Sequence, residues 1–310
     1  MIKLDKVKLI TSIEYISDIK YDSFNIILRH DEVLYYKYQQ KTPYSLLIMV
    51  DYSKNKLIIE FSGKILQEHY ISLISIDTIR ECFDNINKIG ICKLDTESII
   101  NDSIVAKCDI TKDIKTDINQ IIPSIRQNII NYSKWSVKPY YSGVVVENVV
   151  ATARYKKRIV IYDKWKELQQ GNSRHFIENL NNSKEILDYY KDKVRFELNL
   201  NTMYQVRQFL NIPDNNLQSV LNAVANPILS IIDETVKFEP QRQKGMTLRD
   251  YERVLLIESC DYDLAKVEAK IRAYSKKSTS ITRAMQPYKD LFHQIKAEQN
   301  MVIDIRKLVC

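Results

Sequence analysis

Three short segments carry most of the information about the fold: SIVAKCDI (residues 103–110), RIVIY (158–162) and KVRFELNL (193–200). Each alternates between apolar and polar side chains, a pattern that is typical of a strand with one buried face. If the three strands are neighbours in one sheet, helices can cover the apolar face. The opposite face then collects six polar or charged side chains, namely Lys107, Asp109, Arg158, Tyr162, Arg195 and Glu197.

The segments around these strands predict the rest of the architecture. Residues up to about 74 are typical of strands, whereas residues 77–89 and 117–130 have apolar side chains at helical spacing. The β-branched run 144–151 precedes 158–162 and predicts a β-hairpin with it. This order of elements predicts an α+β fold, with a largely antiparallel sheet and helices packed on one face.

The pattern becomes helical from residue 202 onward. Apolar stripes at 251–257, 264–274 and 281–295 predict three short helices, and Thr247 with Asp250 forms a capping box before the first. These helices fit a plain bundle or a helix-turn-helix unit. The sequence therefore predicts an α+β domain over residues 1–210 and a helical region over 211–310. Residues 240–245 are the expected linker.

Composition excludes several classes of protein. The 310 residues carry a net charge of +7, which permits a polyanionic partner without requiring one. Four histidines argue against a site built on several imidazoles, and the five cysteines form no C-x-x-C pair. Five glycines and no Walker-type loop argue against an ATP-driven motor. With no signal-peptide pattern and no long apolar run, we expect a cytoplasmic protein without a membrane partner.

The predicted polar face combines groups that act on phosphate. Carboxylates on adjacent strands, with Asp113 just past a strand end, can hold a hard divalent cation such as Mg²⁺ or Mn²⁺. Lys164 and Arg195 can hold phosphate oxygens, and the phenol of Tyr162 can attack phosphorus. Nearby cations or a metal would lower the pKa of that phenol. The simpler interpretation is a solvated face of a one-sided sheet, which also carries alternating charges.

A basic segment surrounds Tyr162. Residues 151–174 contain seven basic and two acidic side chains, interleaved with Tyr155, Tyr162 and Trp165. Positive charge combined with aromatic rings suits a single strand of nucleic acid, which needs both phosphate neutralisation and base stacking. The candidate DNA-binding residues are Arg154, Lys156, Lys157, Arg158 and Lys166.

These motifs resemble those of rolling-circle replication initiators, specifically the plasmid Rep_trans family and the filamentous-phage gene II proteins. The run from Arg158 through Tyr162 and Lys164 to Glu167 is similar to their tyrosine-x-lysine strand, and the run from Val194 to Leu200 is similar to the arginine–glutamate strand that follows it. The segment 108–114 resembles the acidic strand upstream. The resemblance covers roughly residues 57–210 and implies a Rep nuclease-like catalytic domain.

The resemblance implies a metal-dependent, site-specific nickase for single-stranded or origin DNA that works with the host replication machinery. Tyr162 would form a 5′-phosphotyrosine link and free a 3′-hydroxyl. Asp109 and Glu197 would be the metal ligands, with Asp113 the weaker candidate, while Lys164 and Arg195 would hold phosphate oxygens. The paired histidines of related nucleases are missing, so carboxylates would replace them.

Several alternatives stay open at this point. Tyr155, Tyr189 and Tyr190 are rival nucleophiles because each lies close to the same strands in the sequence. The same sheet and helical tail also fit a non-catalytic repressor or RNA-binding module, or an unrelated metal-dependent phosphodiesterase. The sequence does not decide between a plasmid and a phage element, or whether the protein works as a homodimer.

Overall fold

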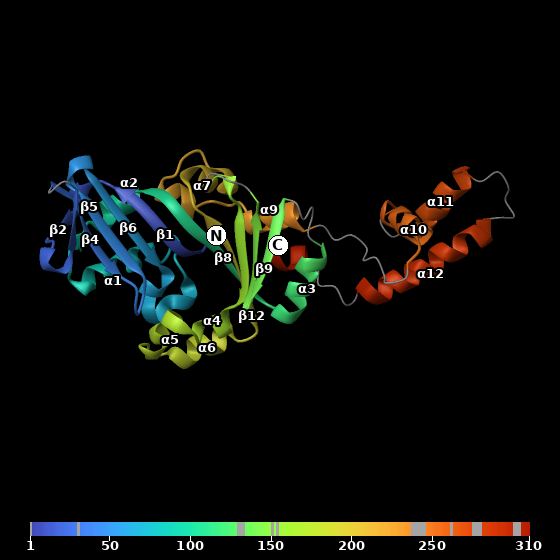
Figure 1. The fold of residues 1–310 in the computed structure, drawn as a ribbon, viewed down its shortest axis with the longest axis horizontal. Coiled ribbons are helices and arrows are strands. Elements are labelled where there is room, and N and C mark those ends of the chain that lie inside the picture. Colours follow the sequence, from blue (N-terminus) through green and yellow to red (C-terminus); the bar gives the residue numbers. More distant parts are fainter. Residues whose placement is uncertain are drawn as a thin grey trace.

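One large antiparallel sheet organises the molecule (Figure 1). The computed structural model describes residues 2–29, 32–128, 134–149, 152, 155–236, 246–260, 263–274, 281–299 and 305–310. Within these residues ten strands form a sheet in the order β3-β4-β5-β6-β1-β8-β12-β11-β10-β9. Their bounds are β1 (Leu4–Thr11), β3 (Asn25–Arg29), β4 (Glu32–Gln40), β5 (Leu46–Asp51), β6 (Lys56–Ser62), β8 (Ile104–Lys115), β9 (Trp135–Tyr140), β10 (Gly143–Asn148), β11 (Arg158–Asp163) and β12 (Lys193–Leu200).

The two halves of the sheet have the same connectivity. In each half the first strand lies at the centre, the last strand pairs with it, and the remaining strands follow outward in reverse order. β1 and β8 pair in the middle, and each begins one half of the sheet. In the first half the meander β3–β6 follows, and its last strand pairs with β1. In the second half the meander β9–β12 follows, and its last strand pairs with β8. The two halves therefore share one topology.

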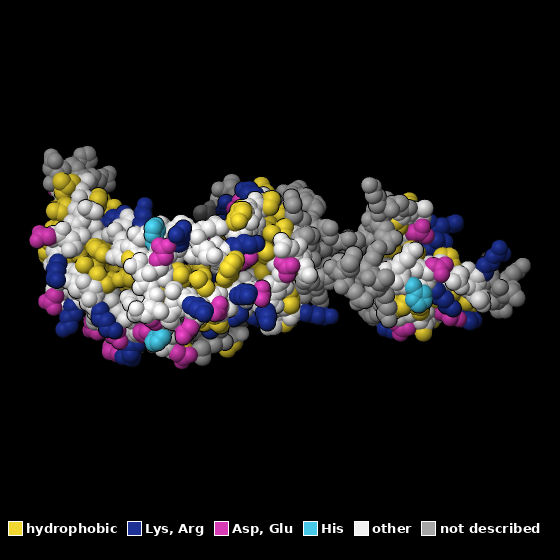
Figure 2. All heavy atoms as spheres, turned by 90° about the horizontal axis from the view of Figure 1, so that it is seen from below, with side chains coloured by type: hydrophobic (Ala, Val, Ile, Leu, Met, Phe, Trp, Pro, Cys, Tyr) yellow, Lys and Arg dark blue, Asp and Glu magenta, His cyan; other side chains and the backbone are white. Residues whose placement is uncertain are grey.

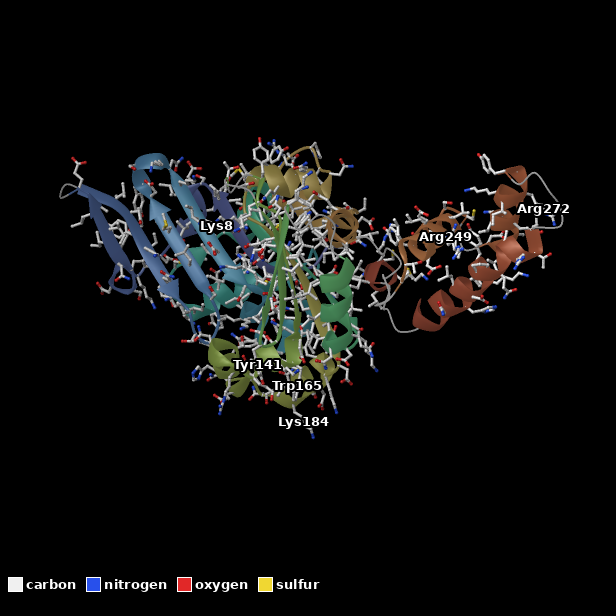
Figure 3. All side chains as sticks on the ribbon, turned by 45° about the vertical axis from the view of Figure 1, so that its right-hand side comes forward. Lys8, Tyr141, Trp165, Lys184, Arg249 and Arg272 are labelled. Carbon is white, nitrogen blue, oxygen red and sulfur yellow. The ribbon has the colours of Figure 1, made fainter. Side chains whose placement is uncertain are left out.

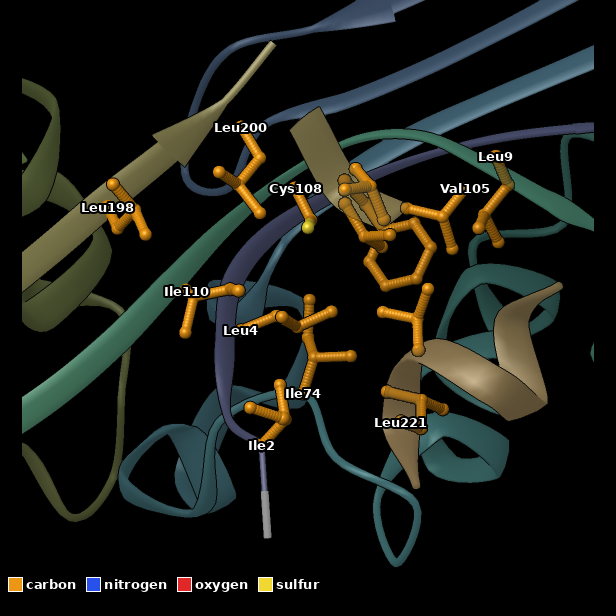
Figure 4. Packing of buried hydrophobic residues seen from close by; sticks show 14 of the residues in the cluster. Ile2, Leu4, Leu9, Ile74, Val105, Cys108, Ile110, Leu198, Leu200 and Leu221 are labelled. Carbon is orange, nitrogen blue, oxygen red and sulfur yellow. The ribbon is translucent and has the colours of Figure 1, made fainter. Parts of the chain in front are cut away.

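The apolar face of the sheet holds the main core. β-branched and aliphatic side chains from the central strands pack there against the surrounding helices (Figure 4). The helices that contribute to this core are α1 (Ile79–Ile89), α2 (Thr96–Asp102), α3 (Ile118–Asn128), α7 (Met203–Leu210), α8 (Leu217–Leu221), α9 (Pro227–Thr235) and α13 (Ile305–Val309). The predicted α+β class, with an antiparallel sheet and a helical C-terminal region, is confirmed.

A second, smaller layer covers part of the opposite face. It consists of the 3₁₀ segment η4 (Gly63–Ser72) with α4 (Lys164–Leu168), α5 (Gly171–Glu178) and α6 (Ser183–Tyr190). Tyr70, Phe176 and Tyr190 belong to a separate apolar cluster in this layer. Helices therefore lie on both faces of the second half of the sheet, whereas the sequence predicted them on one face.

Local signals in the sequence predicted most elements well. The helix predicted at 77–89 is α1, and it ends at Gly90, which has the left-handed φ of 75° that glycine tolerates best. The N-cap residue of α1 is Thr78. The strand predicted at 103–110 continues to Lys115, and the predicted hairpin is β10 paired with β11. Short elements complete the description: η1 (Ile13–Tyr15), η2 (Tyr21–Ser23), η3 (Tyr52–Lys54), and the pair β2 (Ile16–Ser17) and β7 (Lys93–Leu94).

The helices α10 (Leu248–Glu258), α11 (Leu264–Tyr274) and α12 (Ile281–Gln299) have an apolar cluster of their own. As predicted, the hydroxyl of Thr247 accepts a hydrogen bond from the backbone N–H of Asp250 at the start of α10. The predicted linker at 240–245 lies outside the described residues. Among the helices that the structure describes, none is both long and apolar enough to cross a membrane.

The packing does not change at residue 210, where the sequence placed a domain boundary. α8 and α9 bury side chains in the core of the sheet, and so does Val236 after them. After α12 the chain returns to the same core through α13, and Lys112 Nζ donates to the carbonyl of Val309 over 2.7 Å. The segment that contains α10–α12 is therefore connected to the sheet domain at both of its ends.

Candidate functional site

The structure places the three diagnostic strands side by side. β8, β12 and β11 are consecutive neighbours, and antiparallel register aligns Asp113, Arg195 and Tyr162 in one row across them. In an antiparallel pair, residues directly opposite one another project from the same face. Asp109 is likewise opposite Asn199. The predicted polar side chains therefore lie together on one face of the sheet.

Arg195 is the centre of a buried network on this face. Its side chain is fully buried, and its Nε and Nη2 donate to the two carboxylate oxygens of Asp113 at 2.7 Å each. Nη1 donates to Asp5 Oδ1 (2.5 Å) and to the hydroxyl of Tyr70 (3.2 Å). Nη2 also donates to the hydroxyl of Tyr190 (2.9 Å). All five N–H donors of the guanidinium are thus engaged.

This network gives Arg195 and Asp113 a structural role. A guanidinium whose donors are all used by protein oxygens has none left for a phosphate oxygen, so the predicted role of Arg195 does not fit this geometry. Asp113 accepts from Arg195 with both carboxylate oxygens, and its side chain is 6 % exposed. It is therefore poorly placed to act as a metal ligand. Together the two residues fix β8 and β12 to η4, α6 and β1.

Tyr162 lies beside this network and contacts a carboxylate. Its hydroxyl donates to Glu197 Oε2 over 2.9 Å, and the residue is 7 % exposed. Burial, and then the charge of Glu197, raise the pKa of the phenol well above its usual value. The expectation of a lowered pKa is wrong for this structure, because desolvation and carboxylates outweigh the neighbouring Arg195.

The backbone of β10 approaches Tyr162 unusually closely. Gly143 is opposite Tyr162 in the register, and a Cβ atom added at Gly143 would lie 2.6 Å from the Cβ of Tyr162 and 2.2 Å from the carbonyl oxygen of Ile161. Only glycine permits this approach. Tyr140, the last residue of β9, is opposite Gly143 and is 42 % exposed. The most exposed aromatic ring of this row therefore belongs to Tyr140.

Asp109 and Glu197 form an acidic pair that shares one amide. Asn199 Nδ2 donates to Asp109 Oδ1 (2.7 Å) and to Glu197 Oε1 (3.0 Å), while Arg158 donates to the Oδ1 atom of Asn199. Burial, followed by the charge of Glu197, raises the pKa of Asp109 to about 7. Burial and the charge of Asp5 raise the pKa of Glu197. Burial, with like charge nearby, therefore makes both carboxyls hold a proton more tightly than usual.

An unpaired hydroxyl lies next to the acidic pair. Thr111 is opposite Glu197 in the register, is almost fully buried, and its Oγ1 atom has no hydrogen-bond partner within the described structure. Mg²⁺ commonly uses one or two protein carboxylates and completes its shell with water and substrate phosphate. Asp109 and Glu197, with this free oxygen beside them, fit such a cation. In the described part of the chain, no group of three or more His, Cys, Asp or Glu side chains is arranged to hold a metal.

The raised pKa of Asp109 has a measurable consequence for stability. In the folded state the Asp109 carboxyl keeps its proton up to about pH 7, whereas in the unfolded state it loses the proton near pH 4. The contribution of Asp109 to the free energy of unfolding therefore falls as the pH rises from about 4 to about 7. We expect Asp109→Asn to be more stable than the wild type at pH 7.5, by about 1–3 kcal/mol, since a tenfold change in proton affinity corresponds to ~1.4 kcal/mol. Urea denaturation at pH 4.5 and 7.5 checks this. An advantage of equal size at both pH values would contradict it.

Lys164 is buried against the site and forms an ion pair with Glu167. Its Nζ atom donates to Glu167 Oε2 over 2.6 Å and lies 5.5 Å from the ring centroid of Tyr162. Burial lowers the pKa of the ammonium, but Glu167 and other acidic groups outweigh this and raise it. Ser173 and Lys64 extend the chain of hydrogen bonds, because Lys64 Nζ donates to Ser173 Oγ (2.6 Å) and Ser173 Oγ donates to Glu167. Lys164 therefore contributes a fixed positive charge beneath the Tyr162 ring.

The predicted DNA-binding cations are largely paired. Lys156 forms a salt bridge with Glu147 (3.1 Å), Lys157 with Glu234 (2.6 Å) and Lys166 with Asp163 (3.3 Å), whereas Arg158 bonds Asn199. Arg154 lies outside the described residues. Figure 2 views the molecule from the side of α4–α6 and shows basic and acidic side chains interspersed over that face. The basic segment therefore does not produce one surface of a single sign.

The rival tyrosines occupy different environments. Tyr190 is fully buried and supports Arg195, and the ring of Tyr189 lies beneath the ammonium of Lys193. Tyr155 is 52 % exposed and packs edge-on against Tyr204. Among these tyrosines and Tyr162, only the Tyr162 hydroxyl bonds a carboxylate of the acidic pair.

Sequence reasoning missed several groups of this site. Asp5 and Tyr70 reach Arg195 from β1 and η4, and no local pattern predicts that these segments lie close to β12. Asn199 and Thr111 could have been found, since both fall on the polar side of the alternation that identified Asp109 and Glu197. Their neutral side chains attracted no chemical role.

Comparison with known proteins adds no further identification. A scan against models of protein families finds none that matches this chain, and a search among curated proteins finds no match. The similarity to rolling-circle initiators therefore rests on the motifs quoted from the sequence.

Proposed function

We propose that this protein is a rolling-circle replication initiator that nicks and rejoins single-stranded DNA through Tyr162. The observation that carries the proposal is the hydrogen bond from the Tyr162 hydroxyl to Glu197, within an acidic pair of raised pKa. A carboxylate with a raised pKa is a stronger base, and it is already bonded to the proton that must leave. The motif resemblance at the same residues supports the same chemistry.

The reaction balances with the groups present. The Tyr162 oxygen attacks phosphorus, its proton passes to Glu197, and the new O–P bond forms as the bond between phosphorus and the 3′ oxygen breaks. The leaving 3′ oxygen takes a proton from water and becomes a hydroxyl. Rejoining reverses these steps, when the 3′-hydroxyl attacks the phosphotyrosine. Lys164 stabilises the phenolate as it forms, since its ammonium lies 5.5 Å from the Tyr162 ring.

A divalent cation, Mg²⁺ or Mn²⁺, completes the proposed site. Asp109 and Glu197 would hold it, with the Thr111 hydroxyl beside them, and it would stabilise negative charge on the phosphate. A bound cation would also offset the mutual repulsion of the two carboxylates, which adds to burial in raising the pKa of Asp109.

The covalent intermediate supplies the direct test of nicking. The protein is incubated with 5′- and 3′-labelled single-stranded DNA and Mn²⁺, and the products are separated under denaturing conditions. We expect a protein–DNA adduct that carries only the label 3′ to the nick, and a free fragment with a 3′-hydroxyl. Cleavage without an adduct would favour the metal-dependent phosphodiesterase, and DNA that stays intact would contradict the proposed nicking activity.

Metal binding can be measured separately from nicking. Millimolar Mg²⁺ or Mn²⁺ is expected to raise the melting temperature of the wild type, because a ligand that binds only the folded state stabilises it. Glu197→Gln should lose this increase. Glu60→Gln is the matched control, since Glu60 lies on the same face but forms salt bridges with Lys6 (2.5 Å) and Lys8 (3.4 Å). An equal response of the two variants would contradict the metal site.

A second function, nucleic-acid binding without cleavage, is favoured by one observation. Tyr162 is 7 % exposed, so a phosphate reaches it only if groups around it move. In a repressor or RNA-binding module, Tyr162 and Glu197 would simply stabilise the sheet. That function predicts salt-sensitive binding with no covalent product and no metal requirement.

The helices α10–α12 are proposed to assist recognition of origin DNA. Arg249 and Arg272, labelled in Figure 3, are exposed on this unit, as are Lys270 and Arg283. Exposed cations on short helices suit contacts with the phosphates of a duplex. Arg272 also pairs with Glu268 (2.6 Å), so its charge is partly neutralised within α11.

A further inference from the structure

A groove lies at the end of the sheet, next to the candidate site but separate from it. It has a volume of about 560 Å³ and is lined by residues 115–119, 163, 165, 166 and 191–194. We call it the end groove. The ends of β8, β12 and β11 all contribute to it, and these strands also carry Asp109, Glu197 and Tyr162. Its volume is within the range of ordinary ligand sites.

Two lysines face each other in the end groove. Lys115 and Lys193 are directly opposite in the register of β8 and β12, one row beyond Asp113 and Arg195. Like charges placed directly opposite each other destabilise a sheet. Within the described structure, neither lysine forms a salt bridge, and the same holds for Lys191 in the adjoining turn. The groove therefore contains three positive charges without a salt bridge, although the ammonium of Lys193 also contacts the Tyr189 ring, 3.0 Å from its centroid. An anion would stabilise this arrangement.

Three carboxylates also line the groove, and two of them accept hydrogen bonds from backbone N–H groups. Asp163 caps α4 by accepting from the Lys166 N–H (3.0 Å), and it also pairs with the Lys166 side chain. Asp117 accepts from the Asn119 N–H (2.8 Å). The third, Asp192, sits in the turn before β12, where its own carbonyl accepts from the Thr116 N–H (3.0 Å). Hydrogen bonds thus engage the carboxylates of Asp163 and Asp117, whereas no salt bridge within the described structure engages the three lysines.

An aromatic ring completes the lining. Trp165 is 37 % exposed and stands on α4, three residues after Tyr162 in the chain. Figure 3 shows Trp165 and Tyr141 at the same end of the sheet, and Tyr141 is 83 % exposed. Single-stranded DNA needs aromatic rings for base stacking and positive charges for its phosphates, and this end of the sheet has exposed rings beside lysines that form no salt bridge within the described structure.

We propose that the end groove binds the segment of single-stranded DNA that flanks the scissile phosphate, with phosphates on Lys115, Lys191 and Lys193 and a base stacked on Trp165. The proposal rests on the proposed function for the identity of the strand. Lys115 and Lys193 lie two residues along their strands from the Tyr162 row, or about 7 Å at ~3.3 Å per residue. A strand bound in the groove would thus continue directly toward Tyr162.

The two tryptophans of the chain make the groove measurable. Trp135 is 6 % exposed in the core, so Trp135→Phe leaves Trp165 as the single fluorescent indole. Oligo-dT is titrated into this variant in EDTA, which prevents metal-dependent cleavage. We expect Trp165 fluorescence to be quenched, with the same midpoint as binding measured by anisotropy of a labelled oligonucleotide. Binding by anisotropy without quenching would overturn the proposal.

The lysines are tested through the salt dependence of binding. Lys115→Gln with Lys193→Gln should weaken oligo-dT binding at least tenfold and reduce the slope of log K against log[salt] by about 1.4, since each phosphate contact contributes ~0.7. The matched control is Lys37→Gln with Lys41→Gln, at the far end of the sheet, which should leave both values unchanged. The groove double variant should keep a urea midpoint close to that of the wild type, because the repulsion that it removes offsets the lost contact of Lys193 with Tyr189. An unchanged slope in a folded groove variant would overturn the proposal.

The outcomes separate the groove from the nicking activity. Quenching of Trp165 and a reduced salt slope, without a covalent adduct in Mn²⁺, would support DNA binding in the end groove and contradict the proposed nicking activity. A covalent adduct without quenching of Trp165 would support nicking and contradict DNA binding in the end groove.

Discussion

Replacing Arg195 with methionine is expected to lower the free energy of unfolding by about 3–5 kcal/mol. The change leaves Asp113, and in part Asp5, as buried carboxylates without their cation, and it removes five hydrogen bonds at once. Methionine keeps much of the side-chain volume, so the loss reports mainly on charge and hydrogen bonding. Urea denaturation of wild type and variant at pH 7.5 measures the difference.

Arg174→Met is the matched control for Arg195→Met. Arg174 also bonds a carboxylate, Glu178 at 2.7 Å, but its side chain is 67 % exposed. An exposed ion pair contributes no more than about 1 kcal/mol. A similar loss of stability in both variants would refute the structural role of Arg195. Normal stability of Arg195→Met, combined with lost activity, would restore the role in phosphate binding that the motif implies.

Tyr162→Phe is expected to abolish covalent attachment to DNA while DNA binding stays within about twofold of the wild type. The phenyl ring keeps its packing but has no oxygen to attack phosphorus. The variant also loses the hydrogen bond to Glu197, so we expect a decrease in stability of about 1 kcal/mol. A denaturing gel with labelled DNA and Mn²⁺ measures attachment, and anisotropy of the same DNA in EDTA measures binding.

Tyr140→Phe and Tyr155→Phe are the controls for this prediction. Both tyrosines are more exposed than Tyr162, at 42 % and 52 %, and neither hydroxyl donates to Glu197 in the described structure. We expect both variants to form the adduct. Retained attachment in Tyr162→Phe, with loss in one of the controls, would move the nucleophile to that residue.

Alternation along the strands predicted the polar face correctly because it depends only on local geometry. A strand places every second side chain on the same side, so Asp109, Arg158, Tyr162 and Glu197 could be assigned to one face before the sheet was known. The strand order made them neighbours, and no local pattern contains that order. The contact of Asp5 with Arg195 shows the limit, because it joins residues 190 positions apart.

The second helical layer was harder to predict than the sheet. Residues 169–183 are polar and rich in asparagine, and they read as a connection. In the structure they include α5, whose Phe176 and Ile177 are buried. Two apolar residues are too few for a periodic signal, yet with Tyr70 and Tyr190 they are enough to cover the Tyr162 row. Arg195 changes from an expected surface cation into a buried structural one for this reason.

The shared topology of the two half-sheets gives the molecule an internal reference. Glu60 on β6 and Glu197 on β12 occupy comparable strands, since each strand returns to pair with the first strand of its own half. Burial acts on both carboxyls, but Lys6 and Lys8 outweigh it and lower the pKa of Glu60, whereas the pKa of Glu197 is raised. The first half shows that this arrangement of strands can place lysines close enough to a half-buried glutamate to outweigh the effect of burial. The raised pKa of Glu197 is therefore not required by the topology of the sheet, and the proposed cation site lies in the half where nearby cations do not outweigh burial.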